Sequence, residues 1–369
     1  MEPVLRVGLA GFGSVTRAII PAIAAMPNAE LTAVATPRQE PRDQASERYG
    51  VETYAEVEAM CESPNVDVVW VCSPNEFHAE HSIAAAEHGK HVINEKPIAV
   101  TLEEAQSIID VVERTGVRYV QGHSKLFDPP VRRMREIVSS GLLGRVIQIN
   151  TWEYKAWISG APRRAADVET AQGGGVVYRQ GPHQADVVRG IGGGMVKSVR
   201  AIAGRWHPSF PLGEGDYTSF LEFDDGTAAT MAFNGYGYFD ITDLTWGIGE
   251  GGRRSEDGPD LPPGTVTNDQ QKYQPFYGLT VVSCERGDIR QSPNGLYVYT
   301  EDGREKIVIE PSPPGRAELT ELYDAIRDDR PTFPDAAWGM ASLELVLAML
   351  ESSEQRREIT LAHQVPCAF

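Results

Sequence analysis

Two segments of this chain carry side chains that could act on an alcohol. Lys96 lies in Glu95-Lys96-Pro97, directly after the apolar run 91–93. A lysine is costly to hold at the end of a buried strand, which favours a chemical role over a packing role. Its ammonium could polarise a carbinol or carbonyl oxygen and stabilise alkoxide character. An ion pair with Glu95 or another acid is the structural alternative.

The second segment, residues 173–186, places a histidine after three consecutive glycines. Glycines permit close backbone approach, and Pro182 suits the first turn of a helix that carries His183 and Asp186. We expect His183 to act as general base, because imidazole titrates near neutral pH. We expect Asp186 to anchor the helix, since it lies on the same side. A buried structural role is the alternative for His183.

The N-terminal residues predict a dinucleotide site. Residues 4–10 have the composition of a strand, and a glycine-containing turn leads from them into an apolar helix. Pyrophosphate groups bind on the amides of such helix N-termini. The third small position is Thr16 instead of glycine, so the prediction depends on the surrounding strand and helix pattern. The expected pyrophosphate contacts are Gly11, Phe12, Gly13, Ser14 and Val15.

The end of the second predicted strand bears on the choice between NAD and NADP. This strand ends at Thr36, with Arg38 two residues later and no carboxylate at its tip. NAD-binding domains usually place an acid here for the ribose diol, whereas arginine suits a 2′-phosphate. The pattern therefore favours NADP slightly, and NAD stays open. Arg38 could instead be solvated or stack on adenine.

Other cofactor contacts are expected where the third and later strands end. Cofactors bind at the carboxyl ends of parallel strands. Turn chemistry alone would also explain Pro74 and Asn75, and His78 could be an ordinary helix histidine. The residues expected to contact the cofactor at these positions are Ser73, Pro74, Asn75, His78, Glu95, Lys96 and Pro97.

Composition limits the class of protein. The chain has 369 residues, with 41% hydrophobic and 23% charged residues, which is ordinary for a globular protein of two domains. Its net charge of −18 argues against nucleic acid or an anionic membrane surface as partner. The four cysteines show no ligand spacing, so we expect neither disulfides nor a metal site. A cytoplasmic protein that acts on a small molecule is the resulting expectation.

Hydrophobic patterning predicts two domains. Residues 1–123 alternate β-branched runs with helical patterns, which is typical of a doubly wound α/β domain with a parallel sheet. Thr101 and Glu104 predict a capping box, and Gly116 the end of that helix. Residues 124–369 show longer alternating stretches, which favour an α+β domain with a large, mostly antiparallel sheet. Helices are predicted at 130–140, 317–327 and 336–352, and a loop at 247–263.

These motifs resemble the glucose–fructose oxidoreductase/inositol dehydrogenase (Gfo/Idh/MocA) superfamily. The similar segments are residues 8–13, Ser73-Pro74-Asn75 with His78, residues 89–92, and Glu95-Lys96-Pro97. The resemblance covers essentially the full chain. It implies a Rossmann domain, an open-faced C-terminal sheet domain, and hydride transfer with NAD or NADP. It also implies a homodimer or homotetramer formed through the C-terminal sheet.

One motif departs from the superfamily pattern. The usual Asp-x-Gly-x-His-x-x-Asp is here Arg179-Gln-Gly-Pro-His183-Gln-Ala-Asp186. The change removes a carboxylate that helps position the histidine and a substrate hydroxyl in sugar dehydrogenases. It adds a planar cation suited to a carboxylate ligand. Segments 122–130, 179–186 and 279–288 resemble the phthalate 4,5-cis-dihydrodiol dehydrogenase branch. The substrate-binding candidates are His123, Tyr154, Arg163, Arg164, Arg179 and His183.

The resulting hypothesis is a dehydrogenase that oxidises a cis-dihydrodiol bearing one or two ring carboxylates, after which the ketone enolises to a catechol. A sugar or cyclitol dehydrogenase is the first alternative, and Arg179 argues against it because neutral polyols need acceptors. A non-catalytic nucleotide-binding sensor is the second, and the presence of both Lys96 and His183 argues against it. Each arginine could also be a plain surface residue.

Overall fold

The computed structural model describes residues 4–160, 164–208, 210, 213–266, 273–310 and 316–368. The chain divides into two compact units. The first comprises Met1–Ser124 and Pro313–Leu343, and the second comprises Lys125–Ser312 and Glu344–Phe369. The sequence pattern placed everything after residue 123 in the second domain. Residues 313–343 instead join the first unit, because the helix they contain packs on its strands.

The first unit contains a six-stranded sheet with strand order β3-β2-β1-β4-β5-β6. Every strand pair in it is parallel, which confirms the predicted doubly wound sheet. Its strands are nearly free of alternation because both faces are covered. The strands are β1 (Leu5–Ala10), β2 (Ala29–Ala35), β3 (Glu52–Tyr54), β4 (Val68–Val71), β5 (His91–Glu95) and β6 (Tyr119–Gly122).

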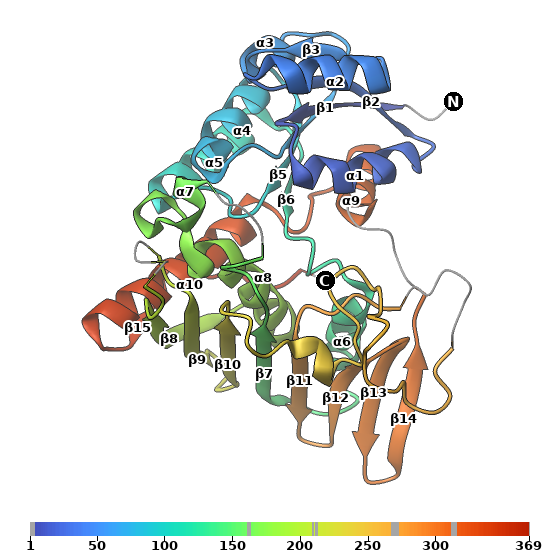
Figure 1. Ribbon diagram of the computed structural model, residues 1–369, viewed down its shortest axis with the longest axis vertical. Coiled ribbons are helices and arrows are strands. Elements are labelled where there is room, and N and C mark those ends of the chain that lie inside the picture. Colours follow the sequence, from blue (N-terminus) through green and yellow to red (C-terminus); the bar gives the residue numbers. More distant parts are fainter. Residues whose placement is uncertain are drawn as a thin grey trace. The chain divides into compact units, whose positions relative to one another are not determined.

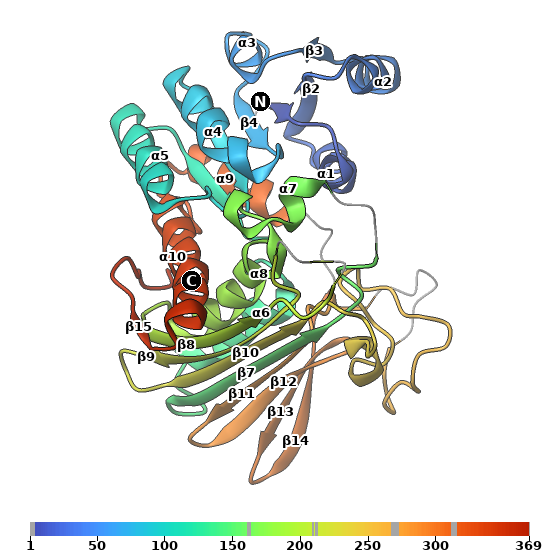
Figure 2. The same cartoon turned by 60° about the vertical axis from the view of Figure 1, so that its left-hand side comes forward.

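Helices cover both faces of this sheet. Strands β2 and β3 lie on one side of β1, and strands β4, β5 and β6 lie on its other side. Right-handed crossovers therefore place the connecting helices of the two halves on opposite faces of the sheet. Figure 2 shows α4 and α5 on one side and α1 on the other. The helices are α1 (Ser14–Ala24), α2 (Gln39–Tyr49), α3 (Val57–Cys61), α4 (His78–Glu87), α5 (Leu102–Thr115), α9 (Arg316–Arg327) and the first part of α10 (Ala336–Gln355).

Local sequence signals set the ends of α5. The Thr101 hydroxyl accepts from the Glu104 amide at 3.2 Å, and Glu104 Oε2 accepts from the Thr101 amide at 3.1 Å. Gly116 ends the helix with φ +72°, a conformation that glycine adopts without strain. The predicted capping box and helix end are therefore confirmed.

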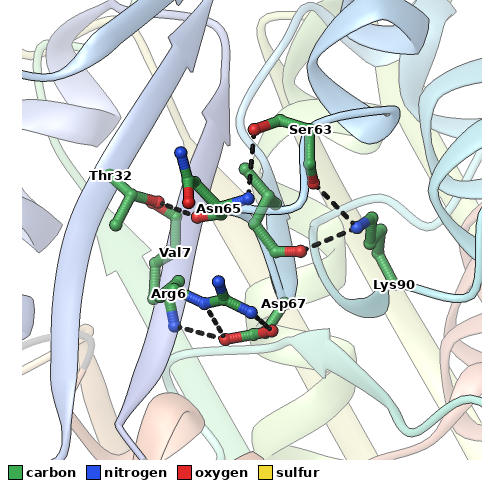
Figure 3. Close-up of polar contacts among 8 residues, drawn as sticks. Arg6, Val7, Thr32, Ser63, Asn65, Asp67 and Lys90 are labelled. Carbon is green, nitrogen blue, oxygen red and sulfur yellow. Dashed lines mark hydrogen bonds and ion pairs between the residues drawn. The ribbon is translucent and has the colours of Figure 1, made fainter.

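A polar network joins the loops at the amino ends of the central strands (Figure 3). Arg6 on β1 donates to Asp67 through Nη2 at 2.6 Å and Nε at 2.8 Å. Lys90 Nζ donates to the carbonyl oxygens of Ser63 and Val66 at 3.0 and 2.8 Å. Because Asp67 precedes β4, these contacts lie at the edge opposite the strand carboxyl ends and hold the two central strands in register.

The second unit contains a nine-stranded sheet with order β14-β13-β12-β11-β7-β10-β9-β8-β15 (Figure 1). Strands β7 and β10 are parallel, and the other described pairs are antiparallel. The mostly antiparallel sheet is confirmed. The strands are β7 (Val146–Tyr154), β8 (Val196–Gly204), β9 (Asp216–Phe223), β10 (Ala228–Asn234), β11 (Leu279–Cys284), β12 (Gly287–Ser292), β13 (Gly295–Thr300), β14 (Gly303–Val308) and β15 (Ile359–Thr360).

The helices of this unit are α6 (Pro129–Ser139), α7 (Ala165–Val168), α8 (Gly175–Gly192) and the rest of α10. Helix α8 packs on β7, β9 and β10, so these strands have one face against a helix (Figures 1 and 2). The prediction that Pro182 lies in the first turn of its helix is wrong. The helix begins at Gly175, where the glycine run supplies φ +78°, and Pro182 lies in its interior.

Residues 247–263 are largely irregular, as the sequence predicted. The predicted loop at 247–263 contains one isolated bridge, between Ile248 and Arg254, and neither a helix nor a strand. Among the described residues, no helix is long and apolar enough to cross a membrane.

Candidate functional site

The turn from β1 into α1 has the geometry of a pyrophosphate site. Gly11 has φ +101°, and a Cβ there would lie 2.8 Å from the Cys72 carbonyl oxygen. Glycine is therefore required where the loops after β1 and β4 approach each other. Gly13 is the N-cap residue of α1, and no side chain accepts a hydrogen bond from the first amides of this helix. These amides are therefore available to an anion. Thr16, at the third motif position, is buried and donates to the Gly13 carbonyl at 2.9 Å.

The tip of β2 carries more positive charge than the sequence pattern indicated. Thr36 is buried, and its amide donates to the Tyr54 carbonyl at 3.0 Å. Arg38 is exposed at the N-cap of α2. Arg42 Nη1 donates to the Thr36 carbonyl at 2.6 Å, so a second guanidinium is fixed at this tip. Sequence reasoning missed Arg42, although its position four residues after Arg38 on a helix was a usable signal.

His78 connects two of the loops predicted to contact the cofactor. Its Nδ1 lies 2.6 Å from the Pro97 carbonyl oxygen and its Nε2 lies 2.9 Å from the Ser73 carbonyl oxygen. The side chain is buried. His81 Nδ1 lies 2.8 Å from Ser73 Oγ. The structure therefore gives His78 a role in fixing the loops after β4 and β5, and its direct contact with a cofactor stays a prediction.

Buried amides hold the backbone around Lys96. Gln121 Nε2 donates to the carbonyl oxygens of Asn94 and Glu95 at 3.0 and 3.2 Å. Asn94 Nδ2 donates to the Ile98 carbonyl at 2.9 Å and to the Tyr119 hydroxyl at 3.0 Å. Because the NH2 groups of both buried amides donate to the backbone on each side of Lys96, they hold the strand end in place.

Glu95 and His123 surround the same strand end. Burial raises the pKa of Glu95, although the charge of Lys96 opposes the shift. Trp70 Nε1 donates to Glu95 Oε1 at 3.4 Å. His123 is buried, and its charge would also lower the Glu95 pKa, so it lies within electrostatic reach of this carboxyl. The first unit thus brings the predicted residues 95, 96 and 123 to one edge of its sheet.

His183 lies on α8 beside a buried tyrosine of the second unit. The ring centroids of His183 and Tyr277 are 5.0 Å apart, with a tilt of 56°. The Tyr277 hydroxyl lies 3.1 Å from both the carbonyl oxygen and Oε1 of Gln180, one turn earlier on α8. Tyr277 is 7% exposed, so its ring forms one wall beside the imidazole.

Two lysines approach the same tyrosine ring. Lys155 Nζ lies 4.7 Å from the Tyr277 centroid and Lys125 Nζ lies 5.5 Å from it. Lys155 forms an ion pair with Glu250, and Lys125 Nζ lies 3.9 Å from a Glu250 oxygen. We call His183, Tyr277, Lys125, Lys155 and Glu250 the Tyr277 cluster. Sequence reasoning did not select its lysines or Tyr277, because its members come from separate segments that carry no common spacing.

A buried carboxyl lies beside the Tyr277 cluster. Glu153 on β7 is 3% exposed, and burial raises its pKa to about 7, although the charge of Lys155 opposes the shift. Burial raises the pKa of Tyr277 well above its usual value, and the charge of Glu153 adds to that shift. The sequence pattern selected the neighbouring Tyr154. Side chains alternate along a strand, so Tyr154 lies on the other face of β7, where its ring packs against Phe239 at 5.7 Å.

Two arginines share one acid in the second unit. Arg179 Nη1 and Arg164 Nη2 lie 3.4 and 2.7 Å from Asp167 Oδ1. Burial alone would raise the pKa of Asp167, but the Arg164 hydrogen bond and the Arg179 charge lower it below its usual value. Two guanidiniums therefore lie against the same oxygen of one carboxylate. Arg163, the third arginine predicted to bind substrate, lies outside the described residues.

Comparison with family models covers most of the chain. Residues 5–123 match the family described as "Oxidoreductase family, NAD-binding Rossmann fold". Residues 131–246 match the model described as "GFO/IDH/MocA C-terminal domain". The first range contains the β1–α1 turn and Lys96, and the second contains His183.

Comparison with individual proteins finds relatives over the full length of the chain and over part of it. The 1-carboxy-3-chloro-3,4-dihydroxycyclohexa-1,5-diene dehydrogenase of Comamonas testosteroni is 30% identical over 99% of this chain and 98% of its own. The scyllo-inositol 2-dehydrogenase (NAD(+)) of Bacillus subtilis is 27% identical over 57% of this chain and 60% of its own. The crystal structure of a putative dehydrogenase from Bordetella bronchiseptica RB50 superimposes with a TM-score of 0.89 and 33% identity, covering 97% and 100% of the two chains.

Proposed function

Because this chain belongs to the GFO/IDH/MocA oxidoreductase family, we propose that it oxidises a ring cis-dihydrodiol carrying a carboxylate. The observation that carries the proposal is the close approach of two guanidiniums, those of Arg164 and Arg179, which lie 2.7 and 3.4 Å from the same Asp167 oxygen. A cationic pair of this kind suits an anionic substrate group. The relative from Comamonas testosteroni, whose name describes a carboxylated dihydroxy-cyclohexadiene as substrate, supports the same substrate class.

The residues of the first unit fit a nicotinamide dinucleotide. Gly11 keeps the turn open, and the uncapped amides of α1 suit the pyrophosphate. We propose that Arg38 and Arg42 favour NADP over NAD, since guanidinium pairs bind a 2′-phosphate better than a free diol. When bound, the nicotinamide supplies the hydride acceptor.

The proposed chemistry divides between two side chains. His183 accepts the proton of the hydroxyl that is oxidised, while Lys96 polarises its oxygen. Arg179 holds the ring carboxylate through two parallel hydrogen bonds. The resulting ketone then enolises, and aromatisation to a catechol makes the reaction favourable. Lys96 needs a rigid backbone for this role, and the buried amides of Asn94 and Gln121 provide it.

The proposal is tested with Arg179→Ala, measured on a carboxylated dihydrodiol and on its uncarboxylated analogue. Loss of a charge-assisted pair should cost about 2–4 kcal/mol, or roughly 30- to 1,000-fold in kcat/KM, on the carboxylated substrate alone. Arg179→Lys should recover only part, because an ammonium lacks the planar fork. Equal losses on both substrates would refute the carboxylate contact.

A matched control is Arg205→Ala. Arg205 Nη2 lies 3.4 Å from Glu214 Oε1, so this variant also removes an arginine from an acid in the second unit. It should leave the preference for carboxylated substrates unchanged. The same assay with inositols and simple sugars tests the alternative of a cyclitol dehydrogenase, which the similarity to scyllo-inositol 2-dehydrogenase supports.

We further propose that the protein acts in the cytoplasm as a homodimer or homotetramer through the nine-stranded sheet. Phe220 and Ile202, 50% and 44% exposed, lie on adjacent strands on the face that alternates away from the buried residues. Apolar residues on an open sheet face favour association. Mass determination by light scattering on wild type and on Phe220→Glu tests this, since the charge should dissociate the assembly.

A further inference from the structure

Glu153 has a position that packing alone does not explain. In β7 the side chains of Ile149, Thr151 and Glu153 are buried on one face, with Glu153 one residue from the strand end. A Cβ at Gly278, which has φ +69°, would clash with the Trp152 carbonyl oxygen and would lie 3.1 Å from Glu153 Oε2. The close backbone approach therefore requires glycine here, and the residue after Tyr277 lies directly beside Glu153 Oε2.

The same oxygen lacks a hydrogen bond within the part of the chain that the structure describes. Glu153 Oε2 is buried and has no donor there. Buried carboxyl oxygens are rarely left in this state, because losing water without a compensating hydrogen bond is costly. A donor from outside the polypeptide would remove this cost.

The Tyr277 cluster connects Glu153 with the proposed base. Lys155, which follows the last residue of β7, places Nζ 4.7 Å from the Tyr277 centroid, and that ring lies 5.0 Å from the His183 ring. Burial raises the pKa of Tyr277, and the charge of Glu153 adds to this shift, so Glu153 lies within electrostatic reach of the ring. Glu153 and His183 are therefore neighbours of the same side chain.

We propose that Glu153 binds the substrate hydroxyl adjacent to the one that His183 deprotonates, by accepting its hydrogen bond through Oε2. The inference rests on the proposed function, in which the substrate carries two neighbouring hydroxyl groups. It also supplies a carboxylate to a site whose motif has Arg179 in place of an acid. A hydroxyl is the fitting donor, since it is small and neutral and donates one hydrogen bond.

The test compares Glu153→Gln with wild type on two saturated ring carboxylates, one with two cis hydroxyls and one with a single hydroxyl. The amide keeps the shape of the side chain but weakens the acceptor. We expect kcat/KM to fall about 10- to 100-fold on the diol and less than about threefold on the single alcohol. Equal losses on both substrates, or no loss on the diol, would overturn the inference.

A binding measurement makes the result independent of turnover. Titration of the cofactor-loaded enzyme with a catechol carboxylate and with a hydroxybenzoate, followed by tryptophan fluorescence, should show the same selective loss in Glu153→Gln. Glu153→Asp keeps the charge, so it should restore part of the preference for two hydroxyls. If Glu153→Gln does not fold, Glu153→Asp carries the test alone, and an unchanged preference in it contradicts the inference.

The control variant is Glu250→Gln. It removes a carboxylate that lies beside Lys125 and Lys155 and leaves Glu153 in place. Any change in kcat/KM should therefore be equal on the diol and on the single alcohol. An error in the proposed function would be seen in the wild-type enzyme and not in the Glu153 variants. If wild type oxidises neutral polyols and no carboxylated dihydrodiol, that function is wrong, and Glu153→Gln is then compared on the polyol and its deoxy analogue by the same criterion.

Discussion

Replacing Glu153 by glutamine should change how the stability of the protein depends on pH. Burial raises the pKa of this carboxyl from 4.5 to about 7 in the folded protein. Between these two values the folded protein keeps a proton that the unfolded chain has released. The unfolding free energy therefore falls as pH rises across this window and the contribution levels off above pH 7. Glutamine cannot titrate, so the variant lacks this loss.

The size of the effect follows from the two pKa values. A pKa raised from 4.5 to about 7 corresponds to about 3 kcal/mol at pH 8, at about 1.36 kcal/mol per pKa unit. Lys155 and Lys125 lower this pKa, whereas Glu250 and Asp240 raise it, and all four remain in the variant.

The measurement is urea unfolding of wild type and Glu153→Gln between pH 5 and pH 8. The difference in unfolding free energy should grow in favour of the variant by about 2.5 kcal/mol between pH 5 and pH 8. Burial also raises the pKa of Asp128 to about 6, but that slope is common to both proteins. Glu222→Gln removes a partly exposed acid paired with Lys197. Its unfolding free energy should change with pH in parallel with that of wild type. Parallel curves for Glu153→Gln would refute the reasoning.

Two further predictions concern the reaction and the cofactor. Lys96→Met and His183→Ala should each lower kcat by about 10²- to 10⁴-fold with cofactor binding retained, measured by reduced-nicotinamide absorbance and fluorescence titration. Near-normal turnover in either variant would show that its role is wrong. Thr36→Asp should shift preference from NADP⁺ towards NAD⁺ by at least about tenfold, because the new carboxylate accepts from the ribose diol and repels a 2′-phosphate. A wild-type enzyme that strongly selects NAD⁺ in titration would contradict this.

Features that depend on the local backbone could be predicted from the sequence. The capping box of Thr101 and Glu104 needs only one helical turn, and the structure confirms it. Gly11 was identified as part of a tight strand–helix turn, and its positive φ and its contact with the next loop explain why glycine is needed. The parallel sheet of the first unit followed from the runs of β-branched residues, since strands covered on both faces show little alternation.

Two strands could not be predicted, because they carry too few apolar residues for a recognisable pattern. Strand β14 (Gly303–Val308) has three charged residues and only Ile307 and Val308 as apolar ones, and it forms by pairing with β13 at the edge of the sheet. Strand β15 (Ile359–Thr360) has two residues and exists through its pairing with β8. Pairing partners and register depend on distant segments, which local composition does not specify.

The sequence alone determined the family, the cofactor turn and the candidate residues Lys96 and His183. Only the tertiary structure decided their surroundings. Arg179 was expected to bind a substrate carboxylate, and the fold places its guanidinium 3.4 Å from Asp167, a neighbour that the sequence did not indicate. Tyr154 was selected and Glu153 was passed over, although alternation along β7 buries the latter and leaves its oxygen without a donor among the described residues. Burial and ion pairing are decided by groups that are remote in sequence, so residue type and spacing could not reveal them.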